Sequence, residues 1–168
     1  PFKVHINTIM DYSFFWIISL YEYYKTYGDK DFLEQIQDQM KAVMDFCLER
    51  RDEDGFMRGK PGDWVFIDWA PMDKTGALCG EQILFAKAME CYAAICAVIG
   101  RDDRGLGGEA EKLRKQIFEK FYDTEKKVFI DSYESGKRNV TRQSNILAYL
   151  FLGCDDTVKK DIYERVVL

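Results

Sequence analysis

The sequence has little of the chemistry on which metal and redox sites depend. Its 168 residues include a single histidine, His5, so no two histidines can share a metal ion. The five cysteines are odd in number and lack C-x-x-C spacing, which favours small buried side chains over a disulfide framework or a zinc site. We therefore expect no metal and no cofactor. Cys79, at the junction of a loop and an apolar segment, is the one thiol whose reactivity merits a test.

The sequence also lacks a strong charge of one sign and a long apolar run. Its 24 basic and 29 acidic residues give a net charge of -5, and they alternate in stretches such as 109–115, which is typical of solvated helix faces. No basic stripe is available to neutralise phosphates, so nucleic acid is not an expected partner. The apolar run from Phe14 to Leu20 is much shorter than the roughly 20 residues that span a bilayer, so no membrane segment is expected.

The length and the ends of the sequence indicate part of a larger protein. A chain of 168 residues with 47% hydrophobic residues is the size of one domain with a buried core. It starts at Pro1 without an initiator methionine or a signal peptide, and it stops at Leu168 within a helical pattern. We therefore expect residues 1–168 to form a single partial domain.

Hydrophobic spacing predicts six helices arranged as three hairpins. Three segments are apolar around most of their circumference, as in helices with neighbours on several sides: 11–27, 77–99 and 140–152. Each is followed by a segment with one apolar stripe, as in helices packed on one side only: 31–51, 109–121 and 155–168. This alternation of inner and outer helices predicts an all-α fold, with about three helical hairpins of a double-layered (α/α) toroid.

The connections between these helices alternate in length. Short or glycine-rich turns follow the inner helices, whereas long loops at 52–76 and 122–139 precede the next inner helix. Both long loops should therefore lie at the N-terminal end of the inner helices, where the helix dipole and free N–H groups favour oxygen-rich ligands. Within them, residues 54–57 and 127–131 are expected to form one or two short β-pairs. A functional site is expected at this end.

The first long loop contains two acidic-aromatic pairs, Asp63–Trp64 and Asp68–Trp69. A carboxylate can accept hydrogen bonds from two sugar hydroxyls, and an indole face can cover the apolar side of a sugar ring. These pairs therefore favour a carbohydrate site. The alternative is that both tryptophans are core residues that cap a helical bundle.

Other carboxylates and aromatic rings are expected at the same end. They are Asp11, Asp73 and Glu81, together with Trp16 and Tyr133. Glycoside hydrolysis needs two carboxyl groups about 5 to 9.5 Å apart, the separation depending on whether the anomeric configuration is retained or inverted. The alternative for these three acids is a structural role at the start of a helix.

Five segments carry a further signal: Met10–Tyr24, Tyr27–Asp29, Phe66–Gly76, Phe121–Asp123 and Gln143–Gly153. In their order and spacing they resemble bacterial α-L-rhamnosidases. The resemblance covers nearly the whole sequence. It implies that the chain is part of a six-hairpin (α/α) catalytic domain and contributes about three consecutive hairpins.

The resemblance also implies an activity for the parent protein. It implies a glycoside hydrolase that removes terminal α-L-rhamnosyl residues with inversion of configuration, without a cofactor and with rhamnosides as substrate. By the same resemblance Asp68, Trp69 and Asp11 line the sugar subsite, and Trp64 and Asp63 match it less closely. The compartment stays open among periplasmic, secreted and cytoplasmic.

The motifs that carry the catalytic residues of that family are absent from this sequence. The general acid belongs to an Arg-Asp-Glu motif upstream, and the general base is a glutamate downstream. The chain is therefore expected to form one wall of the sugar pocket and to be inactive by itself. Gln143 stands where the family often has histidine, which leaves the exact sugar open.

Two other functions fit the same patterns. One is another six-hairpin glycosidase, such as a glucosidase, a fucosidase or an unsaturated-uronyl hydrolase. The other is a helical interaction module without catalysis, although no repeated 34-residue signature is present. Half a toroid would expose apolar flanks at 12–24 and 140–152, so we expect this chain to bind the remainder of the parent chain, and by itself to self-associate or to be marginally stable.

Overall fold

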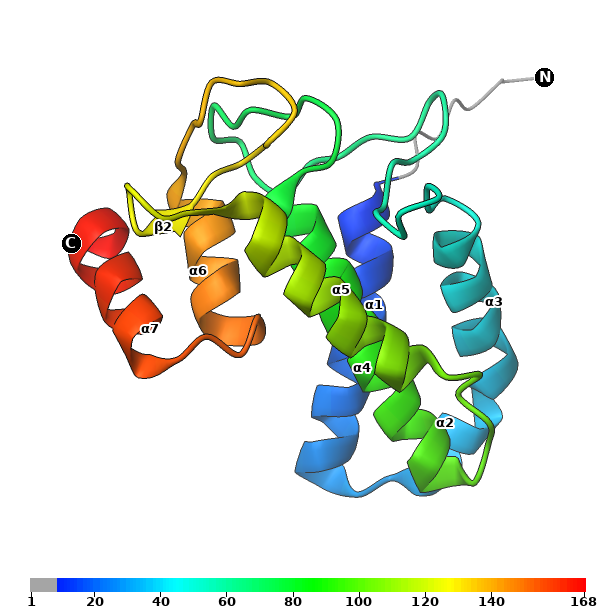
Figure 1. The fold of residues 1–168 in the computed structure, drawn as a ribbon. Coiled ribbons are helices and arrows are strands. Elements are labelled where there is room, and N and C mark those ends of the chain that lie inside the picture. Colours follow the sequence, from blue (N-terminus) through cyan, green and yellow to red (C-terminus); the bar gives the residue numbers. More distant parts are fainter. Residues whose placement is uncertain (1–8) are drawn as a thin grey trace.

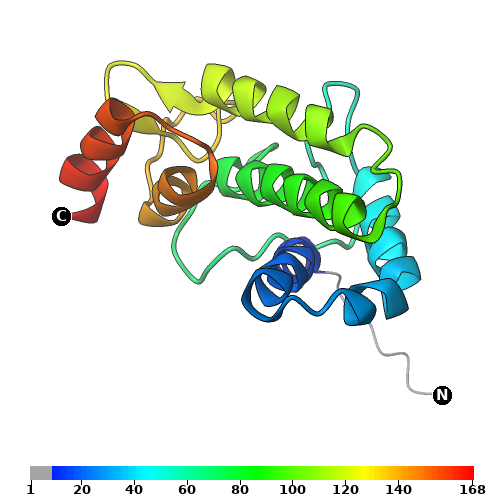
Figure 2. The same ribbon diagram turned by 90° about the horizontal axis from the view of Figure 1, so that it is seen from below.

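The computed structural model describes residues 9–168, so His5 lies outside the described range. Three helices form an inner layer, with α4 (Cys79–Ile99) between α1 (Met10–Tyr27) and α6 (Arg142–Phe151), as Figures 1 and 2 show. The other helices of the described residues pack on the outside of this layer. The all-α fold and the alternation of inner and outer helices are confirmed.

The outer layer completes three hairpins. It consists of α2 (Lys30–Gln35), α3 (Gln37–Leu48), α5 (Leu106–Phe121), α7 (Asp156–Ile162) and the π-helix η1 (Tyr163–Val167). Helix α5 lies along α4, and α7 and η1 lie against α6 (Figure 2). The apolar stripe of each outer helix thus faces an inner helix, which is the arrangement that a narrow stripe predicts.

The single helices expected at 31–51 and 155–168 are each divided in the structure. Ile36, with φ -104° and ψ 9°, interrupts the first between α2 and α3. The second changes from α-helical to π-helical hydrogen bonding at Tyr163. Hydrophobic spacing does not detect either change, because apolar residues continue at helical spacing across both, at Ile36 and Met40 and at Ile162 and Val166.

The β-structure agrees with the expected one or two short pairs in number, but not at both of the expected places. Strand β1 (Tyr122–Asp123) pairs antiparallel with β2 (Val128–Phe129), which confirms a short β-pair in the second long loop. The strand expected at 54–57 is absent. There, Met57 makes only an isolated bridge with Arg51.

The core lies between the inner helices and continues under the outer layer. The rings of Phe14 on α1 and Phe85 on α4 are 5.4 Å apart, and both are fully buried. Helix α4 is long and apolar enough, on length and composition alone, to cross a membrane. However, 67% of its most apolar stretch is buried inside the protein, and a core helix meets the same criterion. Its place between α1, α5 and α6 accounts for its composition.

Both long loops lie at one end of the molecule. In Figure 1 they are at the top, where α1, α4 and α6 begin. This placement confirms the expectation from the alternating loop lengths. It brings residues that are far apart in the sequence together at the starts of the three inner helices.

Candidate functional site

The first turn of α1 holds the part of the long loop that contains the acidic-aromatic pairs. The N–H of Met10 donates to the carbonyl of Trp64 at 3.4 Å. The carboxylate of Asp11 accepts hydrogen bonds from the N–H groups of Phe66 at 3.2 Å and Ile67 at 3.0 Å. Asp11 is 1% exposed, and α1 has no side-chain cap at its N-cap residue, so this carboxylate binds the loop and does not cap the helix.

The backbone of this loop is strained where Asp11 holds it. Ile67 has φ +50°, a left-handed conformation that is unfavourable for a β-branched residue. The next N–H, that of Asp68, donates to the carbonyl of Phe66 at 2.5 Å and closes a tight turn. Such a conformation persists only where its surroundings hold it in place. The two hydrogen bonds to Asp11 supply that restraint.

Asp68 follows this turn and is held by two donors. One oxygen accepts the N–H of Trp69 at 2.7 Å, and the other accepts the side-chain amide of Gln143, on α6, at 2.8 Å. The hydrogen bond from Gln143, and then that from Trp69, lower the pKa of Asp68 below its usual range. A carboxylate can accept about four hydrogen bonds, so each oxygen keeps capacity for a ligand.

Asp68 and Gln143 lie at a cavity of about 250 Å³ between α1, α4 and α6. The remaining walls are apolar: Phe15, Ile67, Leu84, Ile146 and Leu147. Few polar groups in an apolar concave site are typical of small-molecule binding sites, where the polar groups orient the ligand. The cavity thus combines one acidic-amide pair with an apolar lining.

Exposed aromatic rings lie in the same loop as Asp68. Trp69 is 83% exposed and Trp64 is 41% exposed, and the two rings pack edge to face at 6.4 Å between centroids. Phe66 contacts both of them, at 5.5 and 5.1 Å. The alternative in which both tryptophans are core residues therefore does not apply. Their exposed surfaces are available to a ligand.

Asp63 faces inward and pairs with Arg50. The Nε of Arg50 lies 2.7 Å from the Asp63 carboxylate, and each side chain is 9% exposed. The N–H of Lys60 donates to the same oxygen at 2.7 Å. The Arg50 guanidinium also stacks on the ring of Phe46 at 3.4 Å from its centroid. This buried ion pair fastens the loop to the end of α3.

The other residues expected at this end are buried, packed or hydrogen-bonded within the fold. Asp73 accepts hydrogen bonds from the N–H and the hydroxyl of Thr75 at 3.2 and 2.8 Å. Glu81 is buried in the first turn of α4. Trp16 packs against the core, and the ring of Tyr133 packs against Phe121 at 5.0 Å.

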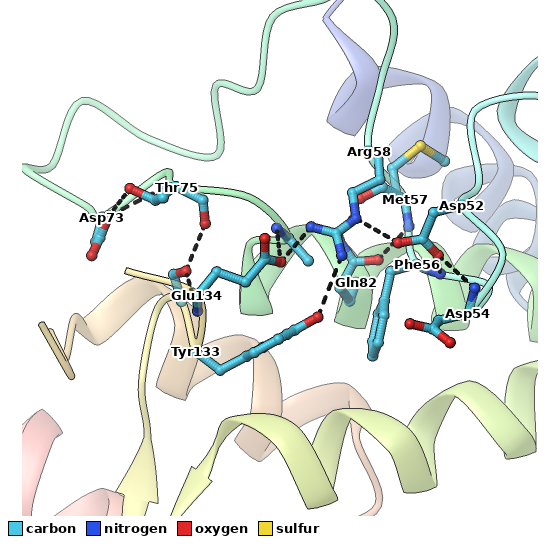
Figure 3. Close-up of polar contacts among 12 residues, drawn as sticks. Asp52, Asp54, Phe56, Met57, Arg58, Asp73, Thr75, Gln82, Tyr133 and Glu134 are labelled. Carbon is cyan, nitrogen blue, oxygen red and sulfur yellow. Dashed lines mark hydrogen bonds and ion pairs between the residues drawn. The ribbon is translucent and has the colours of Figure 1, made fainter. Parts of the chain in front are cut away.

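Arg58 joins the two long loops, as Figure 3 shows. Its guanidinium donates to Asp52 at 2.5 Å and to Glu134, and it lies 3.4 Å from the hydroxyl of Tyr133. Glu134 in turn accepts the N–H of Ala77 at 2.9 Å. Arg58 and Glu134 are 76 residues apart in the sequence. Sequence reasoning did not find this contact, because no local pattern pairs residues at such a distance.

Asp131 fixes the second long loop to the first. It is fully buried and accepts four hydrogen bonds, from Asp73 N–H, Asn139 Nδ2, Thr141 Oγ1 and Ser144 Oγ, at 2.6 to 3.2 Å. Its own N–H and carbonyl pair with Asn139 and Cys79 at 2.8 Å. Sequence analysis missed this residue. The only signal was a carboxylate directly after an apolar strand.

The thiol of Cys79 and the acidic side chains do not form a reactive or metal-binding group. Cys79 is fully buried, and burial raises its pKa well above its usual range, so its thiol is inert. Among residues 9–168, no group of three or more histidine, cysteine or acidic side chains is placed to hold a metal ion.

The comparisons with known proteins agree with the fold. Residues 3–166 match the model of the bacterial α-L-rhamnosidase six-hairpin glycosidase domain. The rhamnosidase of Bacillus sp. GL1, of family GH78, is 26% identical with a TM-score of 0.81 over 93% of this chain. A rhamnosidase from Klebsiella oxytoca with rhamnose bound is 20% identical, with a TM-score of 0.71 over 94% of the chain, and supports the fold alone.

This chain spans only part of those two proteins, 17% of the first and 30% of the second. A comparison with curated proteins gave no match. The family match covers almost the entire chain and agrees with the all-α hairpins, with the long loops at one end and with the segments that resemble the family. The chain therefore belongs to the family of bacterial α-L-rhamnosidase six-hairpin glycosidase domains.

Proposed function

We propose that the protein that contains this chain hydrolyses terminal α-L-rhamnosyl residues with inversion, and that this chain forms one wall of the sugar pocket. The observation that carries the proposal is the placement of Asp68. Its carboxylate is held by Gln143 at the edge of a cavity, beside the exposed indole of Trp69. The family match and the similarity to a GH78 rhamnosidase support the same substrate class.

Asp68, Trp69 and Trp64 are the groups that contact the sugar in this proposal. The Asp68 oxygens accept hydrogen bonds from sugar hydroxyls, because their two protein donors leave lone pairs free. The exposed indole faces cover the C–H side of the ring and exclude water. The side-chain oxygen of Gln143 adds a further acceptor, since its amide nitrogen is already directed at Asp68.

The apolar walls of the cavity suit a deoxysugar. A 6-deoxyhexose such as rhamnose has a methyl group where other hexoses have a hydroxymethyl group. Burial of one such group against apolar side chains contributes about 0.8 kcal/mol. Leu84, Ile146 and Leu147 provide that surface on two inner helices. A hydroxyl in the same place would have no polar partner among them.

Asp11 and Asp63 affect sugar binding indirectly, because they hold the loop that contains Asp68 and Trp69. Both oxygens of Asp11 accept backbone N–H groups, and Asp63 is paired with Arg50. We propose that these two acids position Asp68 and Trp69, and that neither contacts the sugar directly. The restraint reduces the entropy that the loop loses when the sugar binds.

The acid and the base of the reaction come from other parts of the parent protein in this proposal. Inverting hydrolysis needs an acid that protonates the leaving oxygen and a base that activates water on the opposite face of the ring. The carboxylates of Asp11, Asp63 and Asp131 are each occupied by donors within this chain. The chain by itself is therefore expected to be inactive.

The proposal is tested with the full-length protein and a panel of chromogenic glycosides. We expect hydrolysis of an α-L-rhamnoside, with β-L-rhamnose as the first product by proton NMR, and no hydrolysis by the isolated chain. The α-anomer as first product would contradict inversion. Cleavage of only a glucoside, a fucoside or an unsaturated uronide would contradict the substrate, and failure to cleave or bind any glycoside would favour an interaction module.

The C-terminal hairpin has an exposed apolar groove of about 310 Å³. It is lined by Ile146, Tyr149, Leu150, Tyr163 and Val167. Tyr12 and Phe15 on α1 are also exposed, by 57% and 42%. Apolar patches of this kind are typical of surfaces that another element covers. We propose that the remainder of the parent chain covers them in the full-length protein.

We predict that the isolated chain self-associates through these surfaces. Multi-angle light scattering should give a molar mass at least about twice the 19.7 kDa of the monomer at micromolar concentration. Leu150→Lys, which places a charge on a side chain that is 58% exposed, should shift the population towards monomer without loss of helicity. A strictly monomeric wild-type chain would contradict this prediction.

A further inference from the structure

Glu81 is a buried acid that the proposed function does not use. It lies in the first turn of α4 and is 1% exposed. Its Oε1 has no hydrogen-bond partner within residues 9–168. An ionised carboxylate without partners is costly inside a protein, so the neutral form is favoured here. Burial, and to a smaller extent the charges of Asp11 and Asp63, together raise the pKa of Glu81 to about 8.

The charged and titratable groups around Glu81 come from three elements. Asp11 belongs to α1, Asp63 to the long loop, and Cys47 to α3, with Arg50 just after α3. Burial raises the pKa of Cys47 to about 12, so its thiol stays neutral. Arg50 is the cation that acts on Cys47, and it is already paired with Asp63. Ionised Glu81 would therefore be a third negative charge opposite a single positive one.

The same two acids hold the loop. Asp11 binds the N–H groups of Phe66 and Ile67, at the strained turn that precedes Asp68. Asp63 anchors the other end of this segment through Arg50. A new negative charge next to Asp11 would repel its carboxylate in a low-dielectric site, where such repulsion is strong. The restraint on the strained turn would then be lost.

We infer that Glu81 is a positioning residue that holds a proton beneath loop 63–69, and that loss of this proton releases the loop from Asp11. In the neutral form Glu81 can donate a hydrogen bond to a neighbouring carboxylate. In the ionised form it can only accept, and its Oε1 has no hydrogen-bond partner among residues 9–168. The effect on the loop is independent of the substrate, whereas any effect on sugar affinity rests on the function proposed above.

Amide hydrogen exchange of the full-length protein tests this inference. The readout is the protection factor of a peptide that contains Phe66 and Ile67, measured from pH 6.5 to 9.5 and corrected for the intrinsic exchange rate. In the wild type we expect protection to fall, by up to about tenfold for each pH unit, as the pH rises to about 8 and then to level off, because one proton is lost when the loop is released. Glu81→Gln, which cannot ionise, should keep protection constant. Glu119→Gln, at an exposed position on α5, should behave as the wild type.

Equal loss of protection in the wild type and in Glu81→Gln would overturn the inference, and so would constant protection in the wild type. The second criterion applies even if Glu81→Gln does not fold. Loss of protection with an unchanged KM for an α-L-rhamnoside would support release of the loop and contradict the assignment of the sugar to it. A KM that rises with the same midpoint, and only when Glu81 is present, would support both.

Unfolding by urea gives a second readout with a defined sign. The folded-state pKa of Glu81, about 8, lies above the value of 4.5 for an unperturbed glutamate. Its contribution to the free energy of unfolding should therefore fall as the pH rises from about 4.5 to about 8, and then stay level. Glu81→Gln should lack this decline, so a parallel decline in both proteins would count against a protonated Glu81.

Discussion

Asp68→Ala in the full-length protein should lower kcat/KM for an α-L-rhamnoside by about 10- to 100-fold. The substitution removes hydrogen bonds between a charged acceptor and sugar hydroxyls, which contribute about 1.5 to 3 kcal/mol. It also leaves the side-chain amide of Gln143 without its partner. Steady-state kinetics on a chromogenic rhamnoside measure the effect.

Two further variants make this experiment specific. Asp54→Ala, at an exposed position in the same loop region, should leave kcat/KM unchanged. In Gln143→Ala the main cause of the lowered Asp68 pKa is gone. Asp68 would then be protonated at a higher pH, so the acid limb of the pH profile should move towards neutral pH. Wild-type kinetics in Asp68→Ala would contradict the proposed site.

Asp131→Ala should destabilise the protein by about 3 to 5 kcal/mol, the usual cost of removing one partner from a buried charged network. The four donors that converge on this carboxylate would be left unpaired. They include the N–H of Asp73 in one long loop and the hydroxyl of Ser144 on α6. For a chain of this size, the expected fall in Tm is about 10 °C or more. Thermal and urea unfolding of the chain measure it.

The matched control for this prediction is Asp38→Ala, since Asp38 is exposed on α3. It should change stability by less than about 0.5 kcal/mol. Asp131→Asn keeps the shape but replaces one acceptor by a donor that faces donors, so it should still destabilise substantially. If Asp131→Ala unfolds at the wild-type temperature, the two long loops are not held together in the way that we describe.

The helical architecture could be predicted because its signals are local. The width of an apolar stripe is visible within about four turns of one helix. That width depends on how many other elements pack against the helix, and not on which elements they are. The same holds for the alternating loop lengths, which placed both long loops at one end.

The prediction of a strand at 54–57 was wrong, and the reason is also local. Asp52 accepts the N–H groups of Asp54 and Phe56, and Gly55 has φ +90°, so a side-chain-stabilised turn replaces the strand.

The polar interior of the loops could not be predicted because its contacts are distant in sequence. Asp68 and Gln143 are 75 residues apart, and Asp11 and Ile67 are 56 residues apart. An acidic residue beside an aromatic one indicates that the pair lies near a cleft. The direction of the acidic side chain, however, depends on which hydrogen-bond donors the fold brings close to it. For Asp63 that donor is Arg50 and the side chain turns inward, whereas Asp68 stays at the cavity.

The most direct test of the central claim is a crystal structure of the full-length protein with L-rhamnose. We predict that at least one sugar hydroxyl lies within about 3.2 Å of an Asp68 oxygen, with the ring or its methyl group against Trp69 or the apolar wall of α6. Rhamnose bound at a site that contacts neither Asp68 nor Trp69 would contradict the account.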